Sequence, residues 1–452
     1  MIDIRLVRDD PQRVKTALAR RGVAPGDVDA IAGLDRDHRA VLARQETLRA
    51  RVKALSREVA DARRAGDTDR ASTLADESRR VGEEEKAAAQ ESDRLGAELR
   101  TLLLSTPNLP ADDAPEGAGP QDNVERRRWW PGMDDGAPEP VPAEHQRVPH
   151  WELGSALRIL DMASGARLSG SMFPLYRGDG ARLVRALTSL ALSRHAGDYE
   201  EIRPPTLVLT ETMTSTGHLP KFADEAYHIE RDDLWAIPTA EVPLTSMHRG
   251  EILDESDLPV RLTAVSQCFR REAGAAGRDT RGILRVHEFE KVELFAYAAP
   301  DQAPGILADI LSRAEELLRE LRLPYRVLDL CTGDLGTSSA RTFDLEVYAP
   351  GSDRWLEVSS VSWFGDYQAR RANVRYRPAA GGPPVLVHTL NGSALAWPRV
   401  WAALVEWGRQ PDGSVRLPDV LAPWLGPDPV IRPCESEGRQ VRRPLGPDAS
   451  KR

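Results

Sequence analysis

Apolar residues recur every seven positions along two segments of the N-terminal region. Within residues 31–103 they occupy Leu34, Val41, Leu48 and Leu55 in the first segment, and Leu74, Val81, Ala88, Leu95 and Leu102 in the second. Heptads sustained over this length predict two long helices in a left-handed coiled coil. The polar stretch 62–70 between them contains Gly66 and predicts a short turn, so the helices form an antiparallel hairpin about 50 Å long.

Two other stretches have the composition of irregular structure. Residues 105–148 are rich in proline, glycine and acids, which predicts a linker without regular structure. Residues 426–452 have few apolar positions and predict a disordered tail. These boundaries divide the chain into a helical domain at 1–104, the linker at 105–148, a second domain at 149–425 and the tail at 426–452.

The second domain has a different pattern. Short apolar runs bounded by turn residues appear from about residue 150, and helical segments are expected at 181–196, 301–322 and 395–408. The runs are too short, and too irregularly separated by helices, for repeated βαβ units. They are typical of an antiparallel sheet packed with helices, so the sequence predicts an α+β fold.

The exposed side of the first predicted helix carries a row of basic residues, namely Arg36, Arg39, Arg44, Arg49, Arg51, Lys53 and Arg57. Acids are interspersed, and the heptads alone favour a solvated coiled-coil surface. The alternative is a lever that contacts a long polyanion. The net charge of −9 argues against non-specific polyanion binding by the whole chain, but a local basic stripe can still bind nucleic acid.

Cysteine usage and the N-terminus favour the cytoplasm. Cys268, Cys331 and Cys434 are scattered and odd in number, which is typical of a reducing compartment and gives no zinc-ligand spacing. The first residues, MIDIRLVRDDPQRV, carry acids where a signal peptide needs an apolar core. No apolar run approaches the length of a membrane span.

Residues 269–295 concentrate charges of both signs. The stretch reads FRREAGAAGRDTRGILRVHEFEKVELF, with strand-like ends around a Gly- and Ala-rich middle. Its charged residues are Arg270, Arg271, Arg278, Arg281 and Arg285, with Glu272, Glu288, Glu290 and Glu293 among them. A ladder of surface ion pairs would explain some of these charges, since such pairs are common and weak. The surplus of arginine over what the local acids need favours an external polyanion.

Motifs along the chain resemble those of the seryl-tRNA synthetases, a family of class II aminoacyl-tRNA synthetases. FRREAG, GRDTRG and FEKVE are similar to motif 2 of that family. IPTAEVPLTSMHRGEIL, CTGDLG, TFDLEVY, LEVSSVS, DYQARR and HTLNGSALAWPR occur in the family's order and spacing, so the resemblance covers residues 1–425. The family fold is an antiparallel sheet of roughly six or seven strands flanked by helices, preceded by a helical-hairpin arm.

The resemblance implies a reaction and a set of partners. L-serine and ATP, with Mg²⁺, form seryl-adenylate, and the seryl group then passes to the end of serine tRNA, with selenocysteine tRNA as a further acceptor. The arm would lie along the long variable arm of the tRNA. The loop at 274–282, with Arg278 and Arg281, would reach the acceptor end. Pro204 and Pro205 resemble motif 1, which implies a homodimer.

The resemblance also places ATP on particular residues. Arg270 matches the arginine that bridges the α-phosphate and the serine carboxylate, and Glu272 matches the acceptor of the adenine amino group. Arg285 would hold the γ-phosphate, and adenine would stack between Phe289 and Arg399. Arg270, Arg285 and Arg399 are therefore the expected catalytic residues. The other expected ATP contacts are Arg271, the backbone of Val286, and Glu357, Val358, Ser359 and Ser360.

Glu357 and Ser360 correspond to the family's magnesium-binding pair. Residues three apart in a regular strand face opposite ways, so this assignment requires a bulge or a loop. The alternative is a plain edge strand with polar decoration.

The implied serine pocket consists of Thr239, Ala240, Glu241, Arg270, Glu293, Asn391 and Ser393. A small pocket rejects larger amino acids by size. It rejects alanine through polar groups that go unpaired without a hydroxyl. Glu241 or Glu293 paired with the α-amino group fits this logic.

Departures from the family pattern include four residues that add bulk or restrict the backbone. Where members usually read SSCSN and NGSGLAVGR, this chain has Trp363 in the first motif and Ala394, Trp397 and Pro398 in the second. Pro398 fixes its φ and lacks an N–H just before Arg399. Compensated neutral drift is one interpretation. The other is a specialised second copy that resists a serine-mimicking inhibitor or feeds a biosynthetic pathway.

Two further functions stay open from the sequence. The chain could be an inactive paralogue that binds tRNA, although the retained charged motif residues argue against this. It could instead transfer activated serine to a carrier protein or small molecule, although the long arm would then lack a purpose. Serine-dependent pyrophosphate exchange and tRNA charging separate the three hypotheses.

Overall fold

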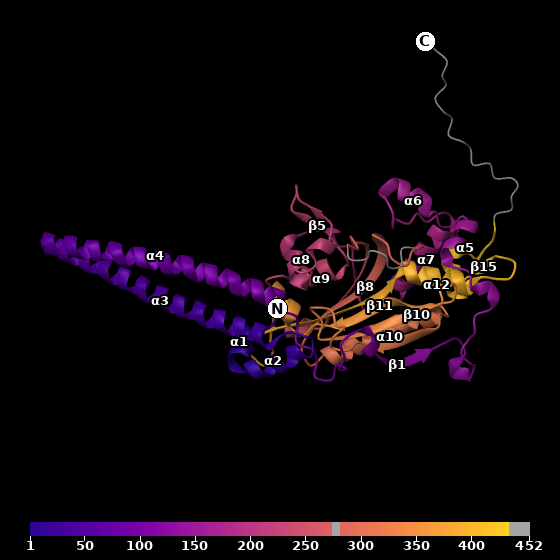
Figure 1. Ribbon diagram of the computed structural model, residues 1–452, viewed down its shortest axis with the longest axis horizontal. Helices are drawn as coiled ribbons and strands as arrows, with labels where there is room; N and C mark the ends of the chain where they lie inside the picture. The colour runs from indigo at the N-terminus through magenta and orange to yellow at the C-terminus, as the bar shows by residue number, and fades with distance from the viewer. Residues whose placement is uncertain (274–280, 434–452) are drawn as a thin grey trace, which may run out of the picture.

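The computed structural model describes residues 1–273 and 281–433. Its N-terminal region contains the helices α1 (Ile4–Asp9), α2 (Pro11–Ala19), α3 (Pro25–Arg64) and α4 (Thr68–Ser105). Helices α3 and α4 pack along their length and extend away from the rest of the molecule (Figure 1). The predicted antiparallel hairpin is therefore confirmed, with its turn between Arg64 and Thr68.

The base of this arm has its own apolar core. Val28 and Ile31 of α3 pack with Leu99 and Leu103 of α4, and the cluster includes Tyr367 of the second domain. Leu102, which the heptad pattern placed inside, is 37% exposed. At the base α4 packs against α1, α2 and the second domain instead of α3 alone, so the buried face shifts to Leu99 and Leu103.

The second domain is built on a large sheet. In the described part of the chain this sheet has eight strands in the order β1-β9-β10-β11-β14-β8-β7-β2. Neighbouring strands are antiparallel except β2 and β7, which are parallel. The bounds are β1 Val124–Trp129, β2 Glu200–Ile202, β7 Val260–Phe269, β8 Glu288–Ala298, β9 Tyr325–Asp329, β10 Arg341–Ala349, β11 Arg354–Trp363 and β14 His388–Ala396. The predicted α+β class is confirmed.

The edge strand β1 lies inside the predicted linker, so the prediction of no regular structure at 105–148 is wrong for residues 124–129. The strand reads VERRRW and is mostly exposed, so no apolar pattern marks it. Ion pairs attach it instead: Arg126 bonds Asp329, and Arg127 bonds Glu315 through Nε at 3.1 Å. Both carboxylates are buried.

Helices cover the sheet on its two faces and one end (Figure 1). Helix α10 packs on β14 and β11, and α12 packs on β10, β11 and β8. The predicted helices at 181–196, 301–322 and 395–408 match α7, α10 and α12 to within two residues. The helix bounds are α5 His150–Ala156, α6 Met162–Ser169, α7 Asp179–His195, α8 Thr210–Thr216, α9 Glu241–Ser246, α10 Ala303–Glu320, α11 Tyr367–Ala372, α12 Trp397–Gly408 and α13 Ala422–Leu425.

Three small sheets complete the described fold. They consist of β3 (Leu207–Leu209), β5 (Leu234–Ala236) and β4 (His228–Ile229); of β13 (Val385–Leu386), β12 (Arg375–Arg377) and β6 (Ile252–Asp254); and of β15 (Val415–Arg416) and β16 (Val430–Ile431). Strand β16 lies in the predicted disordered tail, so that prediction is wrong for 430–431, where Ile431 packs into the main core. Residues 434–452 lie outside the described residues.

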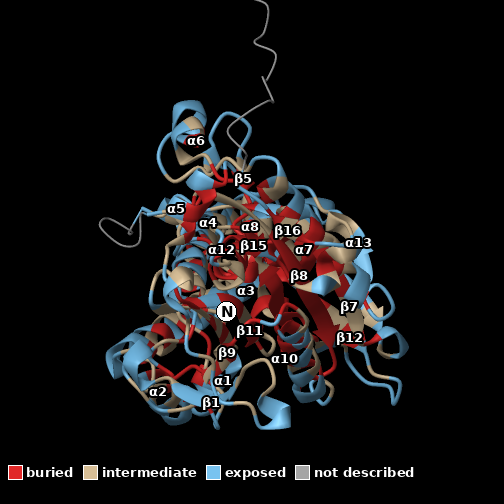
Figure 2. Cartoon of the chain, turned by 90° about the vertical axis from the view of Figure 1, so that its right-hand side faces the viewer, coloured by how far each residue is buried: buried red, intermediate tan, exposed pale blue. Residues whose placement is uncertain are grey.

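The main hydrophobic core lies between the sheet and the helices α7, α10 and α12. Figure 2 shows its buried residues gathered at β7 and β8, with exposed residues around α2 and α6. Cys268 and Cys331 are buried and free, as their spacing predicted, and Cys434 lies outside the described residues. Among the described helices, none combines the length and apolarity that crossing a membrane requires.

Candidate functional site

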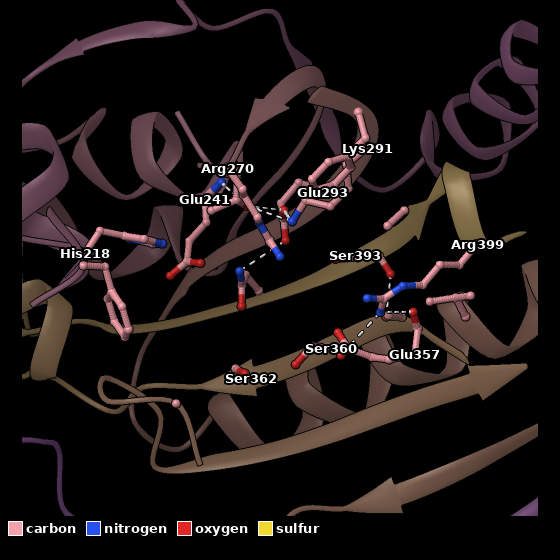
Figure 3. Close-up of a pocket in the computed structure, with 18 of the residues that line it drawn as sticks. His218, Glu241, Arg270, Lys291, Glu293, Glu357, Ser360, Ser362, Ser393 and Arg399 are labelled. Atoms are coloured by element: carbon pink, nitrogen blue, oxygen red, sulfur yellow. Dashed lines mark hydrogen bonds and ion pairs between the residues drawn. The ribbon is translucent and has the colours of Figure 1, made fainter. Parts of the chain in front are cut away.

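A polar cavity of about 400 Å³ lies over the ends of β7, β8, β11 and β14 and beside the first turn of α12. This volume is in the range of ligand pockets. Most of the residues that the sequence assigned to ATP and serine line it (Figure 3). They are Thr239, Glu241, Arg270, Glu272, Arg285, Val286, Phe289, Glu293, Glu357, Val358, Ser359, Ser360, Asn391, Ser393 and Arg399.

Strand β8 provides one wall of the cavity through its period of two. Phe289, Lys291 and Glu293 face the cavity, while the alternating residues Val292 and Leu294 are fully buried in the main core. A strand with one polar face and one apolar face places three functional side chains in a row about 7 Å apart. The FEKVE sequence therefore determines this wall directly.

A β-bulge brings Glu357 and Ser360 to the same face of β11. Leu345 of β10 pairs with Ser359, whereas the next residue, Glu346, pairs with Glu357. Val358 is the extra residue, and it is 1% exposed. The bulge changes the parity of the strand, so Glu357 and Ser360 both line the cavity. The sequence predicted that a bulge or loop was needed here, and this prediction is confirmed.

A second bulge lies in β14, where the family pattern is broken. Ser393 pairs with Glu293, but the next pair is Ala396 with Lys291, which leaves one extra residue in β14. Beyond it, Pro398 occupies the first turn of α12. A first-turn N–H has no partner within the helix, so proline at this position costs little. Arg399 follows and reaches the cavity.

The pocket end near β8 holds two buried carboxylates with different surroundings. Glu293 accepts hydrogen bonds from Thr239 Oγ1 at 2.7 Å and Asn391 Nδ2 at 3.2 Å, and it forms an ion pair with Lys291. Glu241 accepts from Gln368 Nε2 at 2.6 Å, and no lysine, arginine or histidine forms an ion pair with it within the described residues. Burial and then the charge of Glu293 raise the pKa of Glu241 to about 7.

Guanidinium groups line the middle of the cavity, where Arg270 lies, and its opposite end, where Arg399 lies (Figure 3). Arg270 lies 5.2 Å from the centre of the Phe289 ring, and its side chain forms no ion pair in the described part of the chain. Arg399 donates to the carbonyl oxygens of Leu284 at 3.0 Å and Glu357 at 2.7 Å. Arg285 forms an ion pair with Glu272. Within the described residues, an anion entering here meets Arg270 without an ion pair and competes with the present partners of Arg285 and Arg399.

Some predicted residues are not part of this cavity. Arg271 turns away from it and donates to the carbonyl oxygen of Asp224 at 3.1 Å, so its predicted ATP contact has no support from the geometry. Ala240 is fully buried behind Thr239 and Glu241. The predicted acceptor-end loop at 274–282 lies outside the described residues up to 280, Arg278 included. Arg281 lies in a separate hollow with Trp151.

Sequence reasoning missed several cavity residues. Lys291 stands in the FEKVE motif, yet only its buried ion pair with Glu293 shows its place. His218 comes from a distant segment, and burial, followed by the charges of Arg270 and Lys291, lowers its pKa to about 3. Phe222 and the loop 336–339 also line the cavity. No local sequence pattern marks these residues, because they reach the cavity only when the fold brings distant segments of the chain together.

The four unusual residues are spread around the site. Pro398 lines the cavity beside Arg399. Trp397 faces a different hollow that contains Tyr176 and Phe289. Ala394 is fully buried, and Trp363 donates to His388 Nδ1 at 3.3 Å. None of the four lines the end of the cavity with Glu241, Glu293 and Asn391.

Comparison with known proteins gives matches along most of the chain. Residues 225–407 match the tRNA synthetase class II core domain (G, H, P, S and T), and residues 1–110 match the seryl-tRNA synthetase N-terminal domain. The serine–tRNA ligase of Gemmatimonas aurantiaca is 49% identical over 94% of this chain and 99% of its own length. That of Thermomicrobium roseum is 45% identical over 98% of each chain.

Solved structures give the same result. The seryl-tRNA synthetase of Pyrococcus horikoshii, determined with ATP, superimposes with a TM-score of 0.87 at 36% identity. The match covers 96% of this chain and all of that one. The cytoplasmic serine–tRNA ligase of Naegleria fowleri, determined with AMP, gives a TM-score of 0.82 at 27% identity over 96% and 99% of the two chains.

Proposed function

The chain belongs to the seryl-tRNA synthetase family and is a serine–tRNA ligase, and we propose that it activates L-serine in the cavity bounded by Arg270. The observation that carries this proposal is the guanidinium of Arg270, which forms no ion pair with any described residue and lies between two differently charged ends of the cavity. One end has carboxylates for an ammonium group, and the other has cations and an aromatic ring for a nucleotide.

The positive end supports a nucleotide site. The serine carboxylate is ionised at neutral pH, so its attack on the α-phosphate brings two anions together and needs no base. In this proposal Arg270 neutralises both anions, and adenine stacks between Arg399 and Phe289, which both line the cavity. Each charge-assisted contact of this kind is worth about 1.5–3 kcal/mol. Catalysis then consists of positioning and charge neutralisation.

Arg285 and Glu272 bond each other here. We propose that ATP separates them, with Glu272 accepting from the adenine amino group and Arg285 holding the γ-phosphate. Both side chains lie at the cavity wall, so a rotation about side-chain bonds suffices for this exchange.

Glu241 is the favoured partner for the serine ammonium group. Glu293 already has Lys291, Thr239 and Asn391 as donors, whereas Glu241 lacks a cationic partner in the described residues. The ammonium group of bound serine would provide the positive charge that the buried carboxylate of Glu241 lacks nearby. Ser393 and Asn391 line the same end, where a serine hydroxyl satisfies polar groups that alanine leaves unpaired.

The residues present fit a magnesium ion that accompanies ATP. Glu357 and Ser360 share one face of β11 through the bulge at Val358. Beside them Asp344 Oδ1 is buried without a hydrogen-bond partner among the described residues. The described residues contain no cluster of three or more metal-ligating side chains, and Mg²⁺ usually takes only one or two carboxylates with phosphate oxygens and water. When bound, the ion would offset phosphate charge.

The arm supports binding of serine tRNA. Of the basic row on α3, Arg39, Arg49 and Arg51 pair with Asp35, Glu85 and Glu77. Arg36, Arg44, Lys53 and Arg57 have no acid within 4.0 Å in the described residues, so they remain available to phosphates. This favours the lever over the solvated surface, and it explains how an acidic protein can bind RNA. Charging of purified serine and selenocysteine tRNAs tests which acceptors it uses.

We also propose a cytoplasmic homodimer. The segment after β2 carries Pro204 and Pro205 and continues into β3, where Leu207 and Leu209 are 43% and 49% exposed. Exposed apolar residues at the edge of a sheet favour a partner surface. Light scattering at working concentration tests the dimer, and cell fractionation tests the compartment.

Serine-dependent ATP–pyrophosphate exchange is the decisive test of the reaction. Exchange with serine, and much less with alanine or threonine, supports the proposed enzyme. tRNA binding without exchange supports the inactive paralogue. Exchange without tRNA charging, together with acylation of a carrier protein or small molecule, supports the biosynthetic alternative.

The proposed specialised copy concerns the nucleotide end, not the serine pocket, since Pro398 is the unusual residue that lines the cavity. We expect resistance, if present, to affect inhibitors that contact the nucleotide side as well as the serine side. Pro398→Gly combined with Trp397→Val, tested against seryl-adenylate mimics and simple serine mimics, examines this. Unchanged sensitivity to both classes rejects the resistance hypothesis.

A further inference from the structure

A buried hydrogen-bonded chain joins α12 to the segment that leads into β8. Glu406, near the end of α12, and His150, the first residue of α5, are both 0% exposed. His150 Nδ1 lies 2.9 Å from Glu406 Oε1, and the N–H of Ile283 donates to His150 Nε2 at 3.1 Å. Because Nε2 accepts this bond, we assign the imidazole proton to Nδ1, which donates to the carboxylate.

The carboxylate of Glu406 has enough donors to remain buried. Its Oε1 also accepts from the backbone N–H of His150 at 3.0 Å and from Ser352 Oγ at 3.3 Å, and its Oε2 accepts from the N–H of Gly351 at 2.9 Å. A buried carboxylate with this many donors holds a fixed orientation. It therefore fixes the ring of His150 as well.

Ile283 directly precedes the residues that contact the proposed nucleotide. The carbonyl oxygen of Leu284 accepts from Arg399 Nε at 3.0 Å, and Arg285 and Val286 line the cavity. Helix α12 thus holds two successive residues of this segment. It holds Leu284 from its first turn through Arg399, and it holds Ile283 from its last turn through Glu406 and His150.

Gly282 shows how closely the segment approaches the imidazole. Its φ is +65°, and a Cβ built there would lie 2.2 Å from His150 Nε2. Real side chains do not approach this closely, so the ring and the backbone at Gly282 are in contact next to the Ile283 hydrogen bond. A small displacement of either one breaks that bond.

The geometry points to His150 as a positioning residue for ATP. It holds Ile283 at a set distance from α12, and so places Arg285 and Val286 opposite Arg399. His150 is not among the described residues that line the cavity, so it acts through the backbone and touches no substrate. This inference rests on the proposed function, because it concerns the ATP end of that same site.

The test uses two variants of His150 whose side-chain amides each mimic one nitrogen of the imidazole ring. His150→Asn keeps a donor near Nδ1 for Glu406 but offers no acceptor to Ile283. We expect it to raise the KM for ATP in pyrophosphate exchange about tenfold, the usual effect of an unsatisfied buried N–H, with the KM for serine within about twofold. Amide hydrogen exchange at Ile283 should become faster. His150→Gln places an acceptor near Nε2 and should restore most of the ATP affinity.

Ser352→Ala is the matched control, because it also removes a donor from Glu406 Oε1 but lies away from Ile283. It should leave the KM for ATP unchanged. Equal increases in the KM for ATP and the KM for serine in His150→Asn, or an increase in Ser352→Ala as large as in His150→Asn, overturn the inference in favour of a general structural role.

Gly282→Ala covers the case in which His150→Asn does not fold. Its methyl group displaces the segment from the ring while the His150–Glu406 pair remains, so the KM for ATP should rise as well. An unchanged KM for ATP in a folded Gly282→Ala overturns the inference. Wild-type protein without serine-dependent exchange refutes the proposed function itself, which separates the two failures.

Discussion

At the residue scale, Glu241 and Glu293 show how two neighbouring carboxylates acquire different roles. Lys291 offsets the charge of Glu293, and Thr239 and Asn391 fix its two oxygens. Glu241 forms no ion pair with a described residue and accepts from the neutral amides of Gln368 and Asn391. Because burial and the charge of Glu293 raise the pKa of Glu241 to about 7, this group changes charge near neutral pH. Binding of an ammonium group therefore favours release of the Glu241 proton.

Replacing Glu241 with glutamine should remove a pH dependence of serine binding. In the wild type the residue is mainly neutral below about pH 7 and charged above it, so the KM for serine should fall as pH rises from about 6 to about 8. The Glu241→Gln variant should bind serine about tenfold more weakly at pH 8, with a nearly constant KM. Pyrophosphate exchange at several pH values measures this, and the same slope in both proteins would contradict it.

Stability without substrate gives an independent check on Glu241. Its folded-state pKa of about 7 lies above the usual 4.5, so the folded protein binds this proton more tightly than the unfolded chain. The corresponding stability is complete below about pH 4.5 and is lost as pH rises to about 7. The melting temperature of Glu241→Gln, relative to wild type, should therefore increase across this interval, while the control Glu211→Gln, at an exposed position of α8, should not show this increase.

Much of the site at this scale could be predicted from the sequence, for a physical reason. Phe289 and Glu293 follow a period of two, and the requirement for a bulge near Glu357 followed from the parity of a strand. Lys291 and His218 were not predicted, because a local sequence pattern does not distinguish a lysine in a buried ion pair, or a neutral histidine in a pocket, from a surface residue. Arg271 was misplaced, because its motif neighbours Arg270 and Glu272 reach the cavity while it points outward.

At the element scale, ion pairs attach the edge strand β1 to the sheet, whereas the central strands are held by apolar contacts. Arg127 bonds the buried Glu315, which also accepts from Tyr325 Oη at 2.8 Å. Arg126 bonds Asp329, which Arg341 also bonds through Nε at 2.7 Å. Hydrophobic periodicity could not reveal such a strand, because its inward contacts are made by arginines. The heptad repeats predicted α3 and α4 well, since their burial is apolar and regular.

These different partners predict unequal effects of removing the two arginines. Arg127→Ala leaves the buried Glu315 with the neutral hydroxyl of Tyr325 and, as its cationic partner among the described residues, the more distant Arg319 at 3.6 Å, and should lower the free energy of unfolding by about 1–2 kcal/mol. This allows for the partial exposure of Arg127. Arg126→Ala leaves Asp329 paired with Arg341, so it should cost about 0.5 kcal/mol or less. Urea unfolding of the two variants measures both, and equal losses would refute the argument.

Helix α3 yields a prediction for tRNA. Arg44, Lys53 and Arg57 have no acidic partner among the described residues. The triple alanine variant should therefore weaken tRNA binding whatever the nucleotide sequence, and it should reduce the salt dependence of tRNA binding. Its KM for tRNA should rise about tenfold at moderate salt, while tRNA-independent pyrophosphate exchange stays unchanged. A triple variant of Arg64, Arg79 and Arg80, which pair with acids nearby, is the control. An equal rise in the KM for tRNA in both triple variants would show that only the overall charge of the arm matters, which would contradict the prediction.

At the scale of the whole molecule, Arg21 links the helical domain to the wall of the cavity. Arg21 follows α2, and burial lowers its pKa to about 10, so it remains charged at neutral pH. It donates to the carbonyl oxygens of Asn108, Leu335, Gly336 and Ser339 at 2.7–3.1 Å. The loop 336–339 lines the cavity. Arg21 is therefore one of the side chains that join the helical domain and the start of the predicted linker to the site, together with Asn108, whose Nδ2 donates to the carbonyl oxygen of Ser338.

Arg21→Lys keeps the charge but cannot reach carbonyl oxygens on both segments at once, because an ammonium has three donors on one atom. The variant should lose about 1–2 kcal/mol of stability, and the freed loop 336–339 should raise the KM for serine more than the KM for ATP. Arg20→Lys is the control, since Arg20 bonds Ala111, Ala114 and Glu116 at the same junction but contacts no cavity residue. Thermal melting and pyrophosphate exchange decide: lower stability with an unchanged serine KM in Arg21→Lys would show that the junction supports the fold alone.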